Sequence, residues 1–197
     1  MSPLFPTPPM LLLVVLVGEA FLMRGRLSGD ASRKDDRGSL RTLFIVIFGS
    51  VGLAWLAARA FPQAGFAPLF DLDATAMERL YGIGLGFFAA GVILRGYSVA
   101  YLGRLFTYDV AIAADHRVID SGPYRHIRHP AYTGSLLTFV GLGVCGGNAL
   151  SLLVLVAPIA LAFLHRIVIE EAALNSALGS RYADYAGRTK RLVPFVY

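Results

Sequence analysis

The sequence predicts an all-α integral membrane protein with about five transmembrane helices in a single domain, residues 1–197. Hydrophobic residues make up 56% of the chain, charged residues only 16%, and the mean hydropathy is +0.61. This composition is typical of membrane proteins rather than soluble ones. The apolar residues form long runs, and Lys and Arg gather in alternate connecting segments. Membrane topology therefore explains the net charge of +5 better than a nucleic-acid partner does.

The first apolar run extends from Met10 to Met23. No basic residue precedes it and no small-residue cleavage site follows it, so a retained helix is predicted rather than a secretory signal. Glu19 lies within the run. An acid at membrane depth usually faces protein or water, and we expect a hydrogen bond to another helix, with a functional role as the alternative. The following segment, 24–41, is rich in arginine and is predicted to be cytoplasmic.

The second and third runs are Leu43–Phe61 and Leu80–Leu102, and the segment between them has no Lys or Arg from Pro62 to Glu78. It is expected on the opposite side of the membrane. Arg95 lies in the second half of the third run, where it either lines a site or extends its charged end to the interface. The same run contains three alternating glycines, which favour close helix packing over a nucleotide-binding loop: Gly82, Gly84 and Gly86.

Two further apolar runs, Ala131–Cys145 and Ala149–Leu164, follow a polar segment. Three residues, 146–148, join them, which predicts a tight helical hairpin. The fourth helix is short, so it either tilts or ends inside the bilayer. Cys145 is the single cysteine and is expected to be a buried packing residue.

From His165 the chain becomes amphipathic, and Gly179 is the expected end of this helix. A second short helix is predicted around Tyr182 and Tyr185, before the basic segment 188–191. Five spans place the arginine-rich segments on one side, with the N-terminus outside and the C-terminus in the cytoplasm. The amphipathic C-terminal segments then form a cytoplasmic helical cap.

Polar and aromatic side chains are densest in residues 121–134, between the third and fourth runs. Pro123 and Pro130 restrict the backbone there and predict a short, pre-shaped turn. The segment reads Gly122-Pro-Tyr124-Arg-x-x-Arg128-His129-Pro130-x-Tyr132-x-Gly134, and it is followed by Glu170-Glu171 and by Gly179-x-x-Tyr182-x-x-Tyr185. This combination resembles the isoprenylcysteine carboxyl methyltransferase family of integral-membrane methyltransferases. The similarity divides the chain into N-terminal spans without a recognisable motif, 1–94, and a methyltransferase-like half, 95–197.

The resemblance implies that S-adenosylmethionine is the methyl donor and that the acceptor is a lipid or a prenylated small molecule. It places Arg95 and Arg166 near the substrate, and Arg166 and Glu170 are the candidate catalytic residues. The implied cofactor-binding residues are His116, Val118, Ile119, Gly122, Tyr124, Arg128, His129, Pro130, Tyr132, Glu170, Glu171 and Tyr182.

The chemistry of these residue types suits a zwitterionic, aromatic ligand. Arg128 and His129 are candidates for its carboxylate, because a guanidinium donates paired hydrogen bonds. Either glutamate of the 170–171 pair suits the ammonium or the ribose hydroxyls, and the tyrosines suit adenine or the sulfonium. Two alternatives stay open: the basic turn anchors lipid headgroups, and Arg166 pairs with Glu170 within one helix. No metal is expected, since His126 and His129 lack further ligands at suitable spacing.

Methyl transfer from a sulfonium is an in-line displacement that depends on alignment in a dry site. A carboxylate acceptor is already ionised at neutral pH, with a reference pKa of about 3.5, so it needs only orientation, for which Arg166 is the candidate. A phenol, thiol or amine acceptor would require a base such as His116 or Glu170. A lipophilic acceptor is expected to arrive from the bilayer, and the donor from the cytoplasm.

Two other functions remain open at this point. An NADPH-dependent membrane reductase of the sterol type is suggested by the shared Arg-His-Pro-x-Tyr pattern, although the Glu-Glu pair and the tyrosine tail fit it less well. A non-enzymatic scaffold or small transporter is the other alternative. A transporter would be expected to have repeated halves with polar groups near the midplane. The polar groups of this chain instead gather at one interface.

Overall fold

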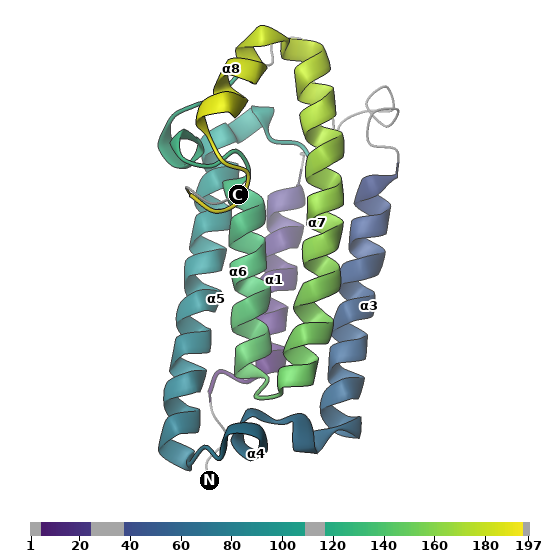
Figure 1. Cartoon of the computed structure of the whole chain (residues 1–197), viewed down its shortest axis with the longest axis vertical. Helices are drawn as coiled ribbons and strands as arrows, with labels where there is room; N and C mark the ends of the chain where they lie inside the picture. The colour runs from purple at the N-terminus through teal and green to yellow at the C-terminus, as the bar shows by residue number, and fades with distance from the viewer. Residues whose placement is uncertain (1–4, 25–37, 109–116, 195–197) are drawn as a thin grey trace.

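The protein is a bundle of long helices with a small helical cap at one end (Figure 1). The computed structural model describes residues 5–24, 38–108 and 117–194. The long helices run alternately up and down, and the cap contains α8. Their bounds are α1 Pro8–Met23, α3 Ser39–Ala60, α5 Ala74–Leu102, α6 Pro130–Cys145, α7 Ala149–Leu178 and α8 Ser180–Arg188. The predicted all-α class is confirmed, and the part of the chain that the structure describes forms no strands.

The lengths of these helices fit an integral membrane protein. Three of them, α3, α5 and α7, are long and apolar enough to cross a bilayer. The other two apolar helices, α1 and α6, have 16 residues each. A helix of that length rises about 24 Å, which is less than the hydrocarbon thickness of about 30 Å. Five spans with a cytoplasmic C-terminus therefore stay a prediction.

Short helices and side-chain caps define the ends of the bundle. Four one-turn elements lie between the long helices: η1 Pro62–Ala64, α4 Phe66–Phe70, η2 Gly103–Leu105 and η3 Gly122–Arg125. At the end opposite the cap, the Asp73 carboxylate accepts from the backbone N–H of Ala76 at 2.7 Å, which caps α5. Asn148 caps α7 in the same way, and its amide nitrogen donates to the Phe61 carbonyl at 3.0 Å. The predicted tight hairpin between α6 and α7 is confirmed.

Glycine allows α5 and α6 to pack with their backbones in contact. A Cβ atom at Gly91 would lie 2.4 Å from the backbone nitrogen of Thr138, and one at Gly134 would lie 2.6 Å from that of Arg95. Of the three glycines predicted to mediate such packing, Gly84 faces Cys145 on α6. The prediction is wrong for Gly82 and Gly86, which face open space because they lie on the other side of the helix.

The helix α7 continues without a break from the bundle into the cap (Figure 1). It ends at Gly179, as predicted, with a φ of +55°. A feature that the sequence did not predict closes the cap: the segment after α8 pairs with the turn that precedes α6. The backbone N–H of Arg128 donates to the Lys190 carbonyl at 2.7 Å, and that of His129 donates to the Arg191 carbonyl at 3.0 Å.

Candidate active site

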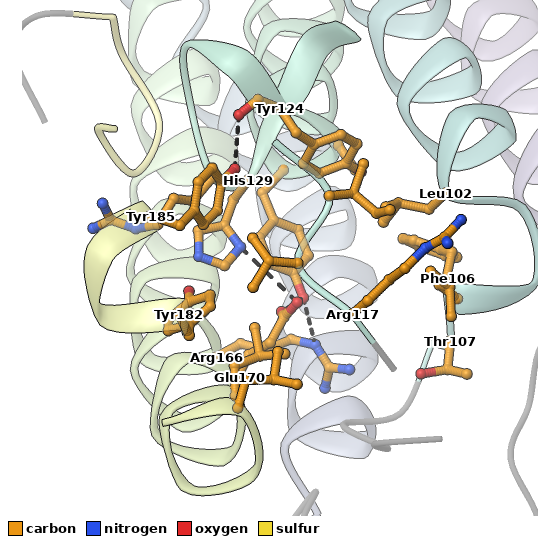
Figure 2. Close-up of a pocket in the computed structure, with 18 residues that line it drawn as sticks. Leu102, Phe106, Thr107, Arg117, Tyr124, His129, Arg166, Glu170, Tyr182 and Tyr185 are labelled. Atoms are coloured by element: carbon orange, nitrogen blue, oxygen red, sulfur yellow. Dashed lines mark hydrogen bonds and ion pairs between the residues drawn. The ribbon is translucent and has the colours of Figure 1, made fainter. Parts of the chain in front are cut away.

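A cavity of about 110 Å³ lies between the cap and the end of the bundle. His129, Arg166 and Glu170 converge at its centre, with Tyr182 and Tyr185 of α8 on one side and Phe106 and Thr107 on the other (Figure 2). We call this space the polar cavity. Its lining comes from the ends of α5, α6 and α7, from α8 and from the connecting segments, so elements that are far apart in the sequence meet here.

At the centre, one phenol connects an arginine to a glutamate. The hydroxyl of Tyr132 donates to Glu170 Oε2 at 2.8 Å and accepts from Arg166 Nε at 3.0 Å. The His129 ring stacks on the Tyr132 ring with centroids 5.6 Å apart, and its Nδ1 lies 4.0 Å from Glu170 Oε1. Arg166 and Glu170 share a face of α7, as their spacing predicts. They are joined through the phenol of a neighbouring helix.

Arg166 is buried, and its donors point in three directions. Beyond Tyr132, its Nη1 donates to Ser39 Oγ on α3 at 2.7 Å, and its Nη2 donates to the Tyr108 carbonyl. The side chain is only 3% exposed. Such a guanidinium is held in one orientation, because a change of rotamer would break several hydrogen bonds at once.

Next to the polar cavity, Glu171 is surrounded by positive groups. Its Oε1 accepts from Arg128 Nε at 2.8 Å and lies 3.3 Å from His129 Nε2, while its Oε2 accepts from Arg191 Nη2 at 2.8 Å. Arg128 also donates through Nη1 to the Ala186 carbonyl at 2.8 Å. These bonds tie the turn, α7, α8 and the C-terminal segment together. Both oxygens of Glu171 are thus occupied by protein donors.

The tyrosines of the cap differ in their partners. Tyr185 donates to the Tyr124 carbonyl at 2.7 Å, and burial raises the pKa of Tyr185 to about 12, so its hydroxyl stays protonated at neutral pH. Burial and the neighbouring Glu171 and Glu170 also raise the pKa of Tyr182. The Tyr182 hydroxyl is buried and has no hydrogen-bond partner among the described residues. An orphan donor in the wall of a cavity fits a bound polar ligand.

A second, apolar cavity of about 130 Å³ lies deeper in the bundle. Side chains of α1, α3, α5, α6 and α7 line it, including Phe44, Ile47 and Phe163. Four residues line both cavities: Phe106, Thr107, Tyr132 and Arg166. These residues form the boundary between a polar space at the cap and an apolar space inside the bundle.

Arg95 lines the apolar cavity and is only 13% exposed, so it does not extend to the interface. It forms an ion pair with Glu19, whose carboxylate also accepts from Tyr108. The predicted hydrogen bond between Glu19 and another helix is therefore confirmed.

The structure brings most of the predicted site residues together. Those that line the polar cavity are Val118, Ile119, Tyr124, Arg128, His129, Tyr132, Arg166, Glu170 and Tyr182. Glu171 and Pro130 lie next to this lining rather than in it. Gly122 lies in the turn with a φ of +56°, and a Cβ atom there would meet the ring of Tyr101, so this position requires glycine. His116 lies outside the described residues.

Several lining residues were not predicted. Leu174 and Leu178 follow Glu170 at intervals of four residues on α7, and this spacing was a usable signal because it marks one helix face. Phe106 and Arg117 lie in connecting segments, where periodicity gives no such signal. Tyr185 belongs to the quoted motif but was not assigned to the site.

The fold and the two cavities define a class: a helical integral membrane protein with a polar site at one end of the bundle and an apolar space beneath it. Residues 84–176 match the model of the isoprenylcysteine carboxyl methyltransferase (ICMT) family. The resemblance seen in the motifs is therefore confirmed for this segment, which is slightly less than half of the chain.

Three known proteins illustrate the similarity. Protein-S-isoprenylcysteine O-methyltransferase B of Arabidopsis thaliana is 35% identical over 115 residues, which cover 57% of this chain and 58% of that protein. The protein-S-isoprenylcysteine O-methyltransferase of Schizosaccharomyces pombe is 32% identical over 114 residues, which cover 57% of this chain and 48% of that protein. A solved structure of the eukaryotic intramembrane Ras methyltransferase ICMT matches with a TM-score of 0.62 and 26% identity, covering 79% of this chain and 53% of that one. The chain thus spans about half the length of these relatives.

Proposed function

We propose that the protein transfers a methyl group from S-adenosylmethionine to a lipophilic acceptor, with the carboxylate of a prenylated cysteine as the favoured acceptor class. The observation that carries the proposal is the boundary at Tyr132 and Arg166, where a polar cavity adjoins an apolar one. A water-soluble donor and a lipid-soluble acceptor need such neighbouring compartments. The names of the relatives favour this function over the NADPH-dependent reductase and the scaffold.

The residues of the polar cavity fit this donor. The Glu170 side chain is 32% exposed. Among the described residues, its Oε2 bonds to the neutral Tyr132 phenol, so the carboxylate suits an ammonium group or ribose hydroxyls. Arg117 and His129 supply positive or polar groups for a carboxylate, and the unpaired Tyr182 hydroxyl supplies a further donor. Leu174 and Leu178 provide an apolar surface for the adenine ring of the donor. The closed network around Glu171 supports a role in shaping this cavity.

A bound sulfonium donor supplies an electrophilic methyl group. The acceptor carboxylate oxygen forms the new C–O bond as the S–CH₃ bond breaks, and no proton needs to be removed. Arg166, held by Ser39 and Tyr132, orients the acceptor oxygen at the boundary. Such alignment supplies about 7 to 11 kcal/mol of a barrier when the reacting atoms are held close. Phe163 and the other apolar side chains of the bundle exclude water around the acceptor chain.

We also propose that the cap faces the cytoplasm and that α1 and α6 cross the bilayer with the three longer helices. This orientation places the arginine-rich segments inside. Cysteine labelling from each side of sealed vesicles, at Arg181 on α8 and at Gln63 on the opposite end, tests it.

The decisive experiment measures donor binding and transfer separately. Purified full-length protein in lipid nanodiscs should bind labelled S-adenosylmethionine in preference to NADPH, and should label S-prenylcysteines that have a free carboxylate but not their methyl esters. Transfer to an ester, or binding of NADPH alone, would contradict the proposal. A methyl-label screen over lipid extracts extends the test to other acceptors.

A further inference from the structure

Within the part of the chain that the structure describes, the helix α1 makes few contacts with the rest of the bundle. Of its 16 residues only Leu11 is buried, and large side chains such as Leu13, Val17 and Phe21 are exposed. Near its start, the Tyr81 hydroxyl donates to the carbonyl of Pro6, just before the helix. Near its other end, the Glu19 carboxylate accepts hydrogen bonds from Arg95 and Tyr108.

The Glu19 carboxylate is held by donors from two separate segments. Arg95 of α5 donates through both Nε and Nη2, the latter at 2.6 Å, and Tyr108, which follows η2, donates its hydroxyl at 2.8 Å. Arg95 Nη1 lies 3.4 Å from the Ala131 carbonyl of α6. Paired hydrogen bonds between a guanidinium and a carboxylate fix both position and orientation. This cluster therefore fixes α1 relative to α5 and to the segment that follows η2.

The same helix forms one wall of the apolar cavity. Val14, Val15, Gly18, Glu19 and Leu22 line it from α1, opposite residues of α5, α6 and α7. Among the described residues few other contacts hold α1, so the Glu19 cluster is placed to set how closely this wall approaches the others. Glu19 also lies outside the family match, which covers residues 84–176.

We propose that Glu19 is a positioning residue for the acceptor: through its ion pair with Arg95 it fixes α1 as a wall of the apolar cavity and so sets which acceptor chains the cavity holds. The proposal rests on the function proposed above. It differs from a direct competition, in which the Glu19 carboxylate occupies Arg95 until an acceptor carboxylate replaces it. The two have opposite consequences for acceptor binding.

The kinetic test uses the full-length Glu19→Gln variant with S-prenylcysteines of short, medium and long chains. We expect the acceptor KM for the best chain length to rise about tenfold, the preference among chain lengths to weaken, and the donor KM and kcat to change by less than about twofold. Glu19→Asp retains the charge and should show a smaller shift. Glu78→Gln, the same change at an exposed position of α5, is the matched control and should equal the wild type.

A distance measurement tests the position of α1 without enzymatic activity. Spin labels at Leu13 and Ile93, which are 60% and 69% exposed, report the separation of α1 and α5. The distribution of distances should broaden in Glu19→Gln and stay narrow in Glu78→Gln. The same label pair shows whether the variant still folds, because an unfolded chain loses the defined distance altogether.

Three results would overturn the proposal in distinguishable ways. An active wild type with unchanged KM and unchanged distances in Glu19→Gln would refute the positioning role alone. A lower KM for carboxylate acceptors would establish competition for Arg95 instead. A wild type that transfers no methyl group to any prenylated acceptor would refute the proposed function, and with it the acceptor role of Glu19.

Discussion

The Tyr132 hydroxyl is the most informative single atom to remove, because it connects the two charged groups at the boundary of the cavities. The substitution Tyr132→Phe deletes the donor to Glu170 and the acceptor for Arg166 while keeping the ring. The ring contacts with His129 and Phe163, at centroid distances of 5.6 and 5.0 Å, should persist. The variant therefore tests the polar connection and leaves the packing in place.

The size of the effect follows from the two lost bonds. Hydrogen bonds to charged groups contribute about 1.5 to 3 kcal/mol each, so the lower bound for the pair is about 3 kcal/mol. If the bonds align Arg166 with the acceptor oxygen, turnover should fall by about a hundredfold, since each 1.36 kcal/mol of barrier is tenfold in rate. Binding of S-adenosylmethionine should weaken far less, because Glu170 remains in the cavity.

Single-turnover transfer of a labelled methyl group, measured beside equilibrium donor binding, separates these effects. Tyr101→Phe is the matched control: its hydroxyl bonds to Ser121 Oγ at 2.9 Å on the exposed surface, outside the cavity lining. It should retain wild-type turnover. A Tyr132→Phe enzyme as fast as the wild type would refute the role assigned to this connection.

Three further predictions concern the surroundings of the site. Glu171→Gln leaves Arg128 and Arg191 without their carboxylate and should destabilise the protein by about 3 kcal/mol in denaturant unfolding in detergent, whereas Asp120→Asn, in an exposed pair with Arg188, should change little. Tyr182→Phe removes a buried hydroxyl that has no partner among the described residues, so the unliganded protein should gain about 1 kcal/mol of stability while donor affinity in calorimetry falls about tenfold; a fall in both stability and donor affinity would contradict this. Gly134→Val should prevent the close contact of α5 with α6 and lower the yield of folded protein on gel filtration, whereas Gly86→Val, in open space, should fold normally.

The sequence predicted the helices well because each depends on a local signal. Apolar runs, prolines and the hairpin at residues 146–148 mark their positions, and the glycine after α7 marks its end. The closure of the cap was missed, because the pairing of Arg128 with the Lys190 carbonyl joins segments far apart in sequence and uses only backbone groups. Of the side chains in this tail, Arg191 does take part by pairing with Glu171, but its charge alone did not indicate which acid it would meet.

The candidate site was predicted at the level of residues but not at the level of their partners. Glu170 and Glu171 were both candidates for the donor's ammonium or ribose hydroxyls, and Glu170 was also a candidate catalytic residue. On a helix, neighbouring residues point about 100° apart, so only Glu170 reaches the cavity, whereas Glu171 faces Arg128 and Arg191. The choice between them depends on the rotation of α7, which the local sequence does not determine.

The rotation of α7 about its own axis also explains how this one helix contributes side chains to both cavities. Phe163, Arg166 and Glu170 lie three and four residues apart, so they follow one face of α7 from the apolar cavity, through the boundary, to the polar cavity. Each step along this face rises about 5 Å. An acceptor whose chain lies beside Phe163 would place its headgroup at Arg166, next to a donor beside Glu170. On the proposed function, the continuity of α7 would let a single helix align the two substrates. We therefore expect substitutions that alter the orientation of Arg166 to affect turnover more than the binding of either substrate.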